Sequence, residues 1–296
     1  MLQVNASGKG EISKRRARIL DIVHRFTQNK LAMLGLVVLI LLIFMALTAN
    51  WIADYDEVVI NQDTSRRLEA PSGDHIFGTD EYGRDLASRV MHGARTSLVI
   101  GFASAFVSVL IGGIVGAVAG FYGGKVDNVI MRFTDILIAI PFMLLAIAII
   151  SALGAGTRNL IMALAIAHTP AYTRLFRVSV LSIRSQEYVE AARSIGCTDG
   201  IIIAKHIIPN TIGPLIVQFT LGIAQSILEA CSLSYIGLGV QPPTPEWGSM
   251  LSEGANLIRN APHLILFPGI AIFLTVLAVN LLGDGLRDAL DPRLKK

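Results

Sequence analysis

Long apolar runs alternate with polar segments along this chain. The first run, 31–53, contains no charged residue. At about 1.5 Å per residue it is long enough to cross a hydrocarbon core roughly 30 Å thick. A signal peptide has a shorter apolar core and a small-residue cleavage site, so we expect an uncleaved anchor. The pattern predicts an all-α integral membrane protein with six transmembrane helices, at 31–53, 98–122, 133–153, 159–173, 211–235 and 264–282.

The basic residues test this topology. Of the 25 Lys and Arg residues, 18 fall in segments that six spans would place inside, namely 1–30, 123–132, 174–210 and the C-terminal tail. The fourth run is short and has Pro170 near its end. If it failed to cross, the five basic residues of 174–210 would lie outside, against the positive-inside rule. We therefore retain the fourth span and expect both termini in the cytoplasm.

The same runs define the organisation of the chain. They predict a basic cytoplasmic segment, a first span, an external segment, a core of five spans and a cytoplasmic tail, at 1–30, 31–53, 54–97, 98–283 and 284–296. We expect the basic segment to form a helix on the anionic membrane surface, with a disordered tail as the alternative. The external segment carries nine acidic residues and five arginines, and its end, 77–95, is predicted to form a helix at the membrane surface.

Small residues and prolines refine the spans. Gly112, Gly116 and Gly120 recur every four residues in the second span, a spacing that lets helix backbones approach closely. Pro141 is expected to kink the third span, which follows a short inner loop at 123–132. The outer loop 236–262 is rich in proline and glycine, and we expect Pro242, Pro243 and Trp247 to form part of a rigid cap.

The cytoplasmic segment 178–210 is predicted to contain two short helices. Ser185 is the expected N-cap of the first helix, and Gly196 falls where a left-handed residue would terminate it. A second helix is expected to begin at Thr198 or Asp199 and to end at Pro209. Such a rigid knob could transmit movement from another subunit.

Three groups on this segment suit a docking surface. Ala191 and Ala192 are small enough for a partner to approach the backbone, and Glu190 offers a charge. An ordinary cytoplasmic linker is the alternative.

Two carboxylates lie within predicted spans. Charged groups there are costly and usually face a bundle interior or water, so Glu229 is a candidate for the pathway or for an inter-subunit contact. Burial against a polar partner for packing is the alternative. Asp135 is the second candidate for the pathway or an inter-subunit contact, although we expect it to form a structural pair with the nearby Arg132 at the inner interface. His168 is isolated from other histidines and cysteines in sequence, so no metal site is predicted.

The spacing in the inner loop resembles the EAA loop of ABC-importer permeases, the element that docks on the ATPase. Further stretches resemble the dipeptide/oligopeptide/nickel permease family of these importers, specifically its C-type subunit. The stretches that carry the resemblance are Glu190-Ala191-Ala192 with Gly196, His206-Ile207-Ile208-Pro209, 77–95, Asp127 with Arg132, Asp135 and Pro141, 233–248 and 283–292. The resemblance implies the type I (MetI-like) fold, with Glu190, Ala191, Ala192, Gly196 and Pro209 coupling the chain to an ATPase.

The resemblance also implies an assembly in a bacterial or archaeal cytoplasmic membrane. Its partners would be a second homologous permease, two ABC ATPase subunits, an external substrate-binding protein or lipoprotein, and membrane lipids, with no nucleic acid. The sequence has no G-x-x-x-x-G-K-[ST] phosphate loop, so this chain would carry no cofactor, and partner subunits would hold ATP and Mg.

The expected function is a transporter permease, not an enzyme, and the expected substrate is a dipeptide or oligopeptide. Nickel and glutathione remain alternatives within the family. A stand-alone secondary transporter would need inverted repeats or broken helices with ion ligands. A membrane-embedded enzyme would need Glu229, Asp135 and His168 to meet, whereas we expect them at different depths.

Overall fold

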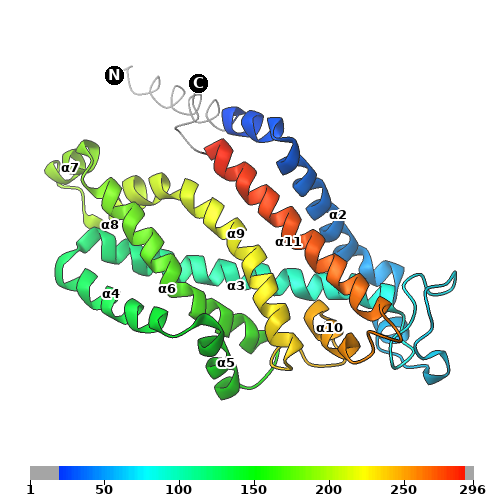
Figure 1. The fold of residues 1–296 in the computed structure, drawn as a ribbon. Helices are drawn as coiled ribbons and strands as arrows, with labels where there is room; N and C mark the ends of the chain where they lie inside the picture. The colour runs from blue at the N-terminus through cyan, green and yellow to red at the C-terminus, as the bar shows by residue number, and fades with distance from the viewer. Residues whose placement is uncertain (1–19, 291–296) are drawn as a thin grey trace.

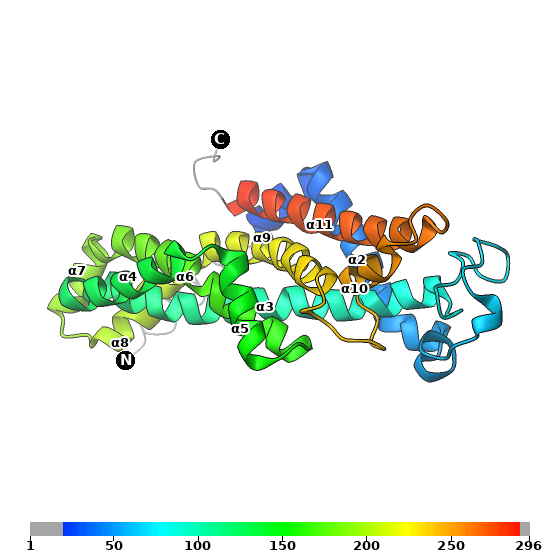
Figure 2. The ribbon, with the colours of Figure 1, turned by 60° about the horizontal axis from the view of Figure 1, so that its bottom comes forward.

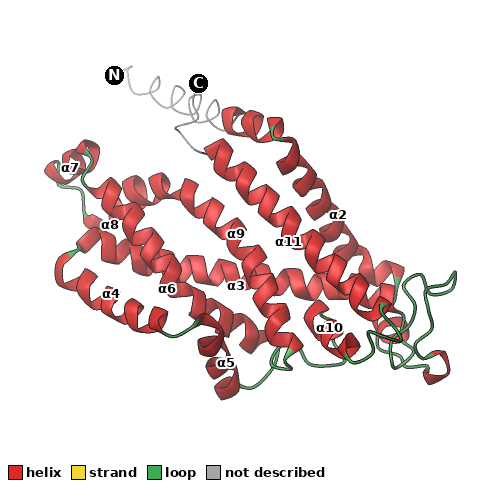
Figure 3. Ribbon diagram, viewed as in Figure 1, coloured by secondary structure: helices red, strands yellow, loops and turns green. Residues whose placement is uncertain are grey.

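The computed structural model describes residues 20–290, which form helices joined by loops and turns (Figures 1 and 3). The predicted all-α class is therefore confirmed. The predicted basic helix lies largely outside the described residues, of which 20–28 are helical. The elements that follow are α2 (Lys30–Ile52), η1 (Tyr55–Val59), η2 (Thr64–Arg66), α3 (Leu86–Tyr122), α4 (Gly124–Ala139), α5 (Phe142–Leu153), α6 (Thr157–Arg184), α7 (Glu187–Ser194), α8 (Asp199–Ile202), η3 (Ile203–Ile207), α9 (Ile208–Tyr235), α10 (Trp247–Ala255) and α11 (His263–Leu290).

Helix α2 coincides with the predicted first span. The side chain of Asn29 caps it by accepting hydrogen bonds from the backbone N–H groups of Leu31 and Ala32, both at 3.1 Å. The helix then packs antiparallel to α11 (Figure 1). A Cβ on Gly35 would come within 2.6 Å of the carbonyl oxygen of Ala278, so only glycine allows this approach.

Helices α3 and α6 form the most extensive pairing in the described part of the chain. The three predicted glycines lie on the contact. A Cβ on Gly116 would approach the carbonyl oxygen of Thr173 to 2.4 Å, and one on Gly120 would approach that of Arg177 to 2.8 Å. The predicted close approach of backbones is confirmed, because each glycine faces main-chain atoms of the neighbouring helix.

The third predicted span is broken rather than kinked. Helices α4 and α5 meet at 91°, with the break at Ile140 and Pro141. Proline lacks an N–H group and pushes the residue before it out of the α-helical region, so the helix ends there. The predicted inner loop at 123–132 is wrong, because α4 begins at Gly124 and runs through it.

Three further boundaries differ from the prediction. Helix α3 begins at Leu86 and is continuous with the second span, while 77–85 form turns, so the expected surface helix over 77–95 is wrong. Helix α10 lies inside the predicted outer loop 236–262. Helix α11 extends to Leu290, so it continues past the predicted sixth span into the predicted tail.

Among the described residues, four helical segments are long and apolar enough to cross a membrane, or five if the bent α4–α5 pair counts as one span. Helix α6 is not among them, although its 28 residues are long enough and it continues beyond the predicted fourth span as expected. Helices α7 and α8 lie at one end of the molecule and the loops between α2 and α3 at the opposite end (Figures 1 and 2).

Candidate functional site

The segment 185–208, which we call the coupling element, folds as two short helices joined by a tight turn. Gly196 has φ +82°, and its N–H bonds the carbonyl oxygen of Arg193 at 3.0 Å. Its predicted left-handed role is confirmed. Helix α8 begins at Asp199 after Thr198, also as predicted. Ser185 is not the N-cap of α7, since Gln186 occupies that position without a side-chain cap bond.

A small apolar core attaches the coupling element to the membrane helices. Val189, Ala192 and Ile202 are buried against Phe121 of α3 and Val180 of α6. This burial of apolar surface stabilises the packing of α7 and α8 against the ends of α3 and α6.

A second contact joins the same helix ends. Arg184 of α6 donates from Nη1 to the carbonyl oxygens of Gly120 at 2.9 Å and Phe121 at 3.4 Å. These are unpaired carbonyls at the C-terminus of α3, where a cation is favourable. The coupling element is thus mounted on two helix ends that are themselves bonded together.

The outward face of the coupling element is open. Glu190, Ala191 and Gly196 are exposed, and the side chain of Ile195 is 80% exposed. Ala192 instead faces the apolar core, so its small side chain serves packing inside this chain. Pro209 does not end a helix as predicted. It lies at the start of α9, directly after a π-helical turn. Proline has no N–H group, so it would interrupt the hydrogen bonds of an α-helix, and the π-helical turn changes the hydrogen-bond spacing at this point.

A polar pocket of about 410 Å³ lies between α6, α9 and α11. Its polar lining residues are His168, Tyr172, Gln218, Gln225 and Asn280. Glu229 is buried beside it. His168 Nε2 lies 2.5 Å from Glu229 Oε2, and Gln225 Nε2 donates to Glu229 Oε1 at 2.6 Å.

The expectation that Glu229 and His168 lie at different depths is wrong, because the two side chains contact each other directly. Asp135 is elsewhere and pairs with Arg174 Nη2 at 2.8 Å, not with Arg132. Both side chains of that pair are about half exposed, so it contributes little to stability. These three groups therefore do not form a common site.

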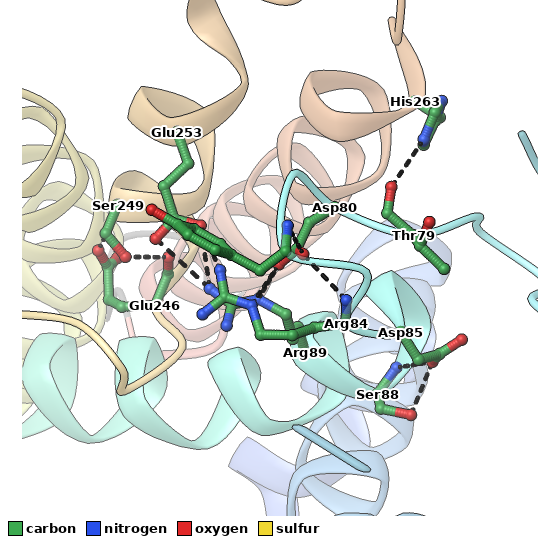
Figure 4. A network of polar contacts seen from close by, with 11 residues as sticks. Thr79, Asp80, Arg84, Asp85, Ser88, Arg89, Glu246, Ser249, Glu253 and His263 are labelled. Atoms are coloured by element: carbon green, nitrogen blue, oxygen red, sulfur yellow. Dashed lines mark hydrogen bonds and ion pairs between the residues drawn. The ribbon is translucent and has the colours of Figure 1, made fainter. Parts of the chain in front are cut away.

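At the opposite end, four charged side chains form a network that joins α3 and α10 (Figure 4). Arg84 donates from Nε to Asp80 at 2.6 Å and from Nη2 to Glu253 at 3.2 Å. Arg89 Nη2 donates to the same Glu253 oxygen at 3.1 Å. Burial raises the pKa of Glu253, and the guanidinium charges of Arg89 and Arg84 oppose that rise. The network ties the start of α3 to α10.

Helix α10 is held in place by its first residues. Glu246 caps it by accepting from the N–H groups of Gly248 and Ser249, both at 2.9 Å. Trp247 is fully buried, and its indole N–H donates to the carbonyl oxygen of Val90 at 3.0 Å. Trp247 is thus a core residue rather than part of an exposed cap. Pro242 and Pro243 precede it in the connecting loop.

Sequence reasoning missed most of the polar pocket and the whole charged network between α3 and α10. One signal was available, because Gln218, Gln225 and Glu229 are spaced by seven and four residues and so share one face of a helix. Only tertiary packing brings Asn280 of α11 to the pocket and brings Glu253 to arginines more than 160 residues away in the sequence.

Comparison with known proteins places these features in a family. Residues 108–296 match the family described as the binding-protein-dependent transport system inner membrane component. Residues 19–71 match the N-terminal transmembrane domain of oligopeptide transport permease C.

Two curated relatives align along nearly the whole chain. The dipeptide transport system permease protein DppC of Alkalihalophilus pseudofirmus is 45% identical over 275 residues, which cover 93% of this chain and 90% of the relative. The glutathione transport system permease protein GsiD of Escherichia coli is 49% identical over 273 residues, covering 92% and 89%.

A solved structure of the MetNI methionine ABC transporter, in inward facing conformations, shares the fold. Its TM-score is 0.57 at 20% sequence identity, and the match covers 69% of this chain and 96% of that chain. In this family ATP is handled by partner ATPase subunits, and the permease has no catalytic chemistry of its own. This chain belongs to the binding-protein-dependent transport system inner membrane component family, as an OppC-type permease subunit of a bacterial ABC importer.

Proposed function

We propose that this chain forms one half of the translocation pathway of an importer for short peptides. A second homologous permease would form the other half, two ABC ATPases would dock on the cytoplasmic side, and an external binding protein or lipoprotein would deliver the substrate. The relatives DppC and GsiD are named for dipeptide and glutathione transport. Both substrates are short peptides, so the shared chemistry favours a peptide over nickel, which remains the alternative within the family.

The observation that carries the coupling role is the way the coupling element is mounted. Its exposed face carries Glu190, while Val189 and Ala192 on its other face are buried against α3 and α6. A displacement of α7 by an ATPase would therefore pass to two helices that border the polar pocket or pack on its walls. Glu190, Ala191, Gly196 and the segment up to Pro209 are the proposed ATPase contact.

The proposed topology has six spans and both termini in the cytoplasm. It counts α6 and the bent α4–α5 pair as crossing elements beside the four apolar ones. Gly200 and Arg158 would then lie on opposite sides of the membrane. Cysteine placed at each position in whole cells should react with an impermeant maleimide only at position 158, in a chain whose Cys197 and Cys231 are replaced by alanine. Equal labelling of both would overturn the topology.

The transport function is tested by reconstitution. The chain, its partner permease, the ATPases and the binding protein are placed in proteoliposomes, and ATP-dependent uptake of labelled alanylalanine, glutathione and Ni²⁺ is measured. We expect uptake of at least one peptide and none of Ni²⁺. Uptake of Ni²⁺ alone, or uptake by this chain without ATPases, would overturn the proposal.

A further inference from the structure

Three polar residues follow one face of α9 into the pocket. Gln218, Gln225 and Glu229 are separated by seven and four residues, so their side chains lie above one another along the helix. Gly222 lies between them on the same face and also lines the pocket. Polar groups in a membrane helix are costly unless they meet partners or water, so such a stripe calls for an explanation.

Several of these groups are not used by the protein itself. Within residues 20–290, the side-chain amides of Gln218 and Asn280 and the hydroxyl of Tyr172 make no hydrogen bond. All three residues line the pocket. Each amide offers two donors and an acceptor, and the hydroxyl offers one donor and an acceptor. The pocket wall therefore presents free donors and acceptors of the kind that pair with peptide groups.

Glu229 has unused capacity as well. Its two carboxylate oxygens receive one hydrogen bond from Gln225 and one contact from His168. Each carboxyl oxygen can accept more than one hydrogen bond, so part of that capacity remains. His168 is held in orientation by Phe142, whose ring stacks on it with centroids 4.5 Å apart. The pair is thus a fixed polar point at one end of the stripe.

The size and charge of the pocket narrow the ligand class. Its volume of about 410 Å³ lies in the range of roughly 300–1,000 Å³ that small-molecule sites occupy. No Lys, Arg, Asp or Glu is among the described residues that line it. Glu229 lies beside the pocket and contacts two lining residues, His168 and Gln225. Neutral hydrogen-bonding groups recognise a peptide backbone whatever its side chains are.

We propose that this stripe is a contact site for peptide cargo inside the permease: Gln218, Asn280 and Tyr172 bind backbone amides, and the Glu229–His168 pair binds the ammonium group. The proposal rests on the proposed peptide import and names the chemistry by which this subunit takes part in it. Gly222 leaves room for the Tyr172 side chain, because a Cβ there would lie 2.0 Å from the Tyr172 hydroxyl oxygen.

The test separates cargo contact from coupling. In the reconstituted complex, uptake of alanylalanine and glutathione and the ATP hydrolysis stimulated by loaded binding protein are measured for Glu229→Gln. We expect uptake to fall about tenfold, as for loss of a charge-assisted hydrogen bond, while stimulated hydrolysis stays within about twofold of wild type. Leu228→Ala is the matched control, because Leu228 is adjacent on α9 but lines a different pocket. It should leave both readouts unchanged.

A second pair of variants covers a folding defect in Glu229→Gln. Gln218→Leu and Asn280→Leu break no hydrogen bond within the described protein, so we expect normal assembly and uptake reduced about threefold or more for each. Wild-type uptake in all three variants would overturn the contact site and leave peptide import standing. A wild-type complex that imports neither peptide would overturn both.

Discussion

Replacing Gly196 by valine should uncouple transport from ATP hydrolysis. Position 196 has φ +82°, and no atom lies within 4 Å of a Cβ built there, so the effect is purely conformational. A left-handed conformation costs about 1–2 kcal/mol for an ordinary L-residue and is least tolerated by β-branched side chains. The variant can avoid this strain only by changing the turn that orients α7.

The strain is comparable with what holds α7 in place. Val189 is almost fully buried, and burying a valine side chain contributes about 1.5–3 kcal/mol. A strain of 1–2 kcal/mol shifts the population of the native turn by a factor of roughly 5–30. We therefore expect the docked arrangement of α7 to be weakened strongly while the membrane helices still assemble.

The assay compares peptide uptake with stimulated ATP hydrolysis in the reconstituted complex for three variants. Gly196→Val should lose most uptake, whereas Gly196→Asn should retain much of it, because asparagine tolerates the left-handed region. Gly213→Ala is the matched control, since Gly213 is helical, has no neighbour within 4 Å and lies outside the coupling element. Equal uptake in Gly196→Val and Gly213→Ala would refute the reasoning.

Three further predictions concern stability, measured as thermal unfolding of the purified complex in detergent. Trp247→Ala should lower the free energy of unfolding by about 3–5 kcal/mol because Trp247 is fully buried, whereas Trp51→Ala should be nearly neutral because Trp51 is 86% exposed. Similar losses for both variants would contradict the assignment of Trp247 to the core. Gly116→Val should disrupt the α3–α6 contact, while Gly213→Ala, with open space around it, should be tolerated. Glu253→Gln removes a charge shared by two guanidinium groups. Because Glu253 is 23% exposed, the loss of unfolding free energy should be about 1–3 kcal/mol, less than for a fully buried pair; an unchanged unfolding midpoint would show that the network does not stabilise the contact between α3 and α10.

The sequence alone was sufficient to predict features that depend on the conformational limits of a single segment. The charge-free run of α2 had to be helical in a membrane, because every backbone polar group must be satisfied within the segment. Gly196 marked the turn of the coupling element, and Pro141 marked where the third span is interrupted, although the prediction was a kink and the structure has a 91° break. Each follows from the conformational limits of one residue type, so no tertiary information was needed.

Tertiary structure decided which polar groups meet. His168 was isolated in sequence, yet packing of α6 against α9 brings it to Glu229, and Asp135 found Arg174 instead of its sequence neighbour. Trp247 was expected in an exposed loop, but α10 folds back into the core. Hydropathy and spacing report what a segment can bury, whereas the partner of a buried polar group is fixed by the arrangement of helices distant in the chain.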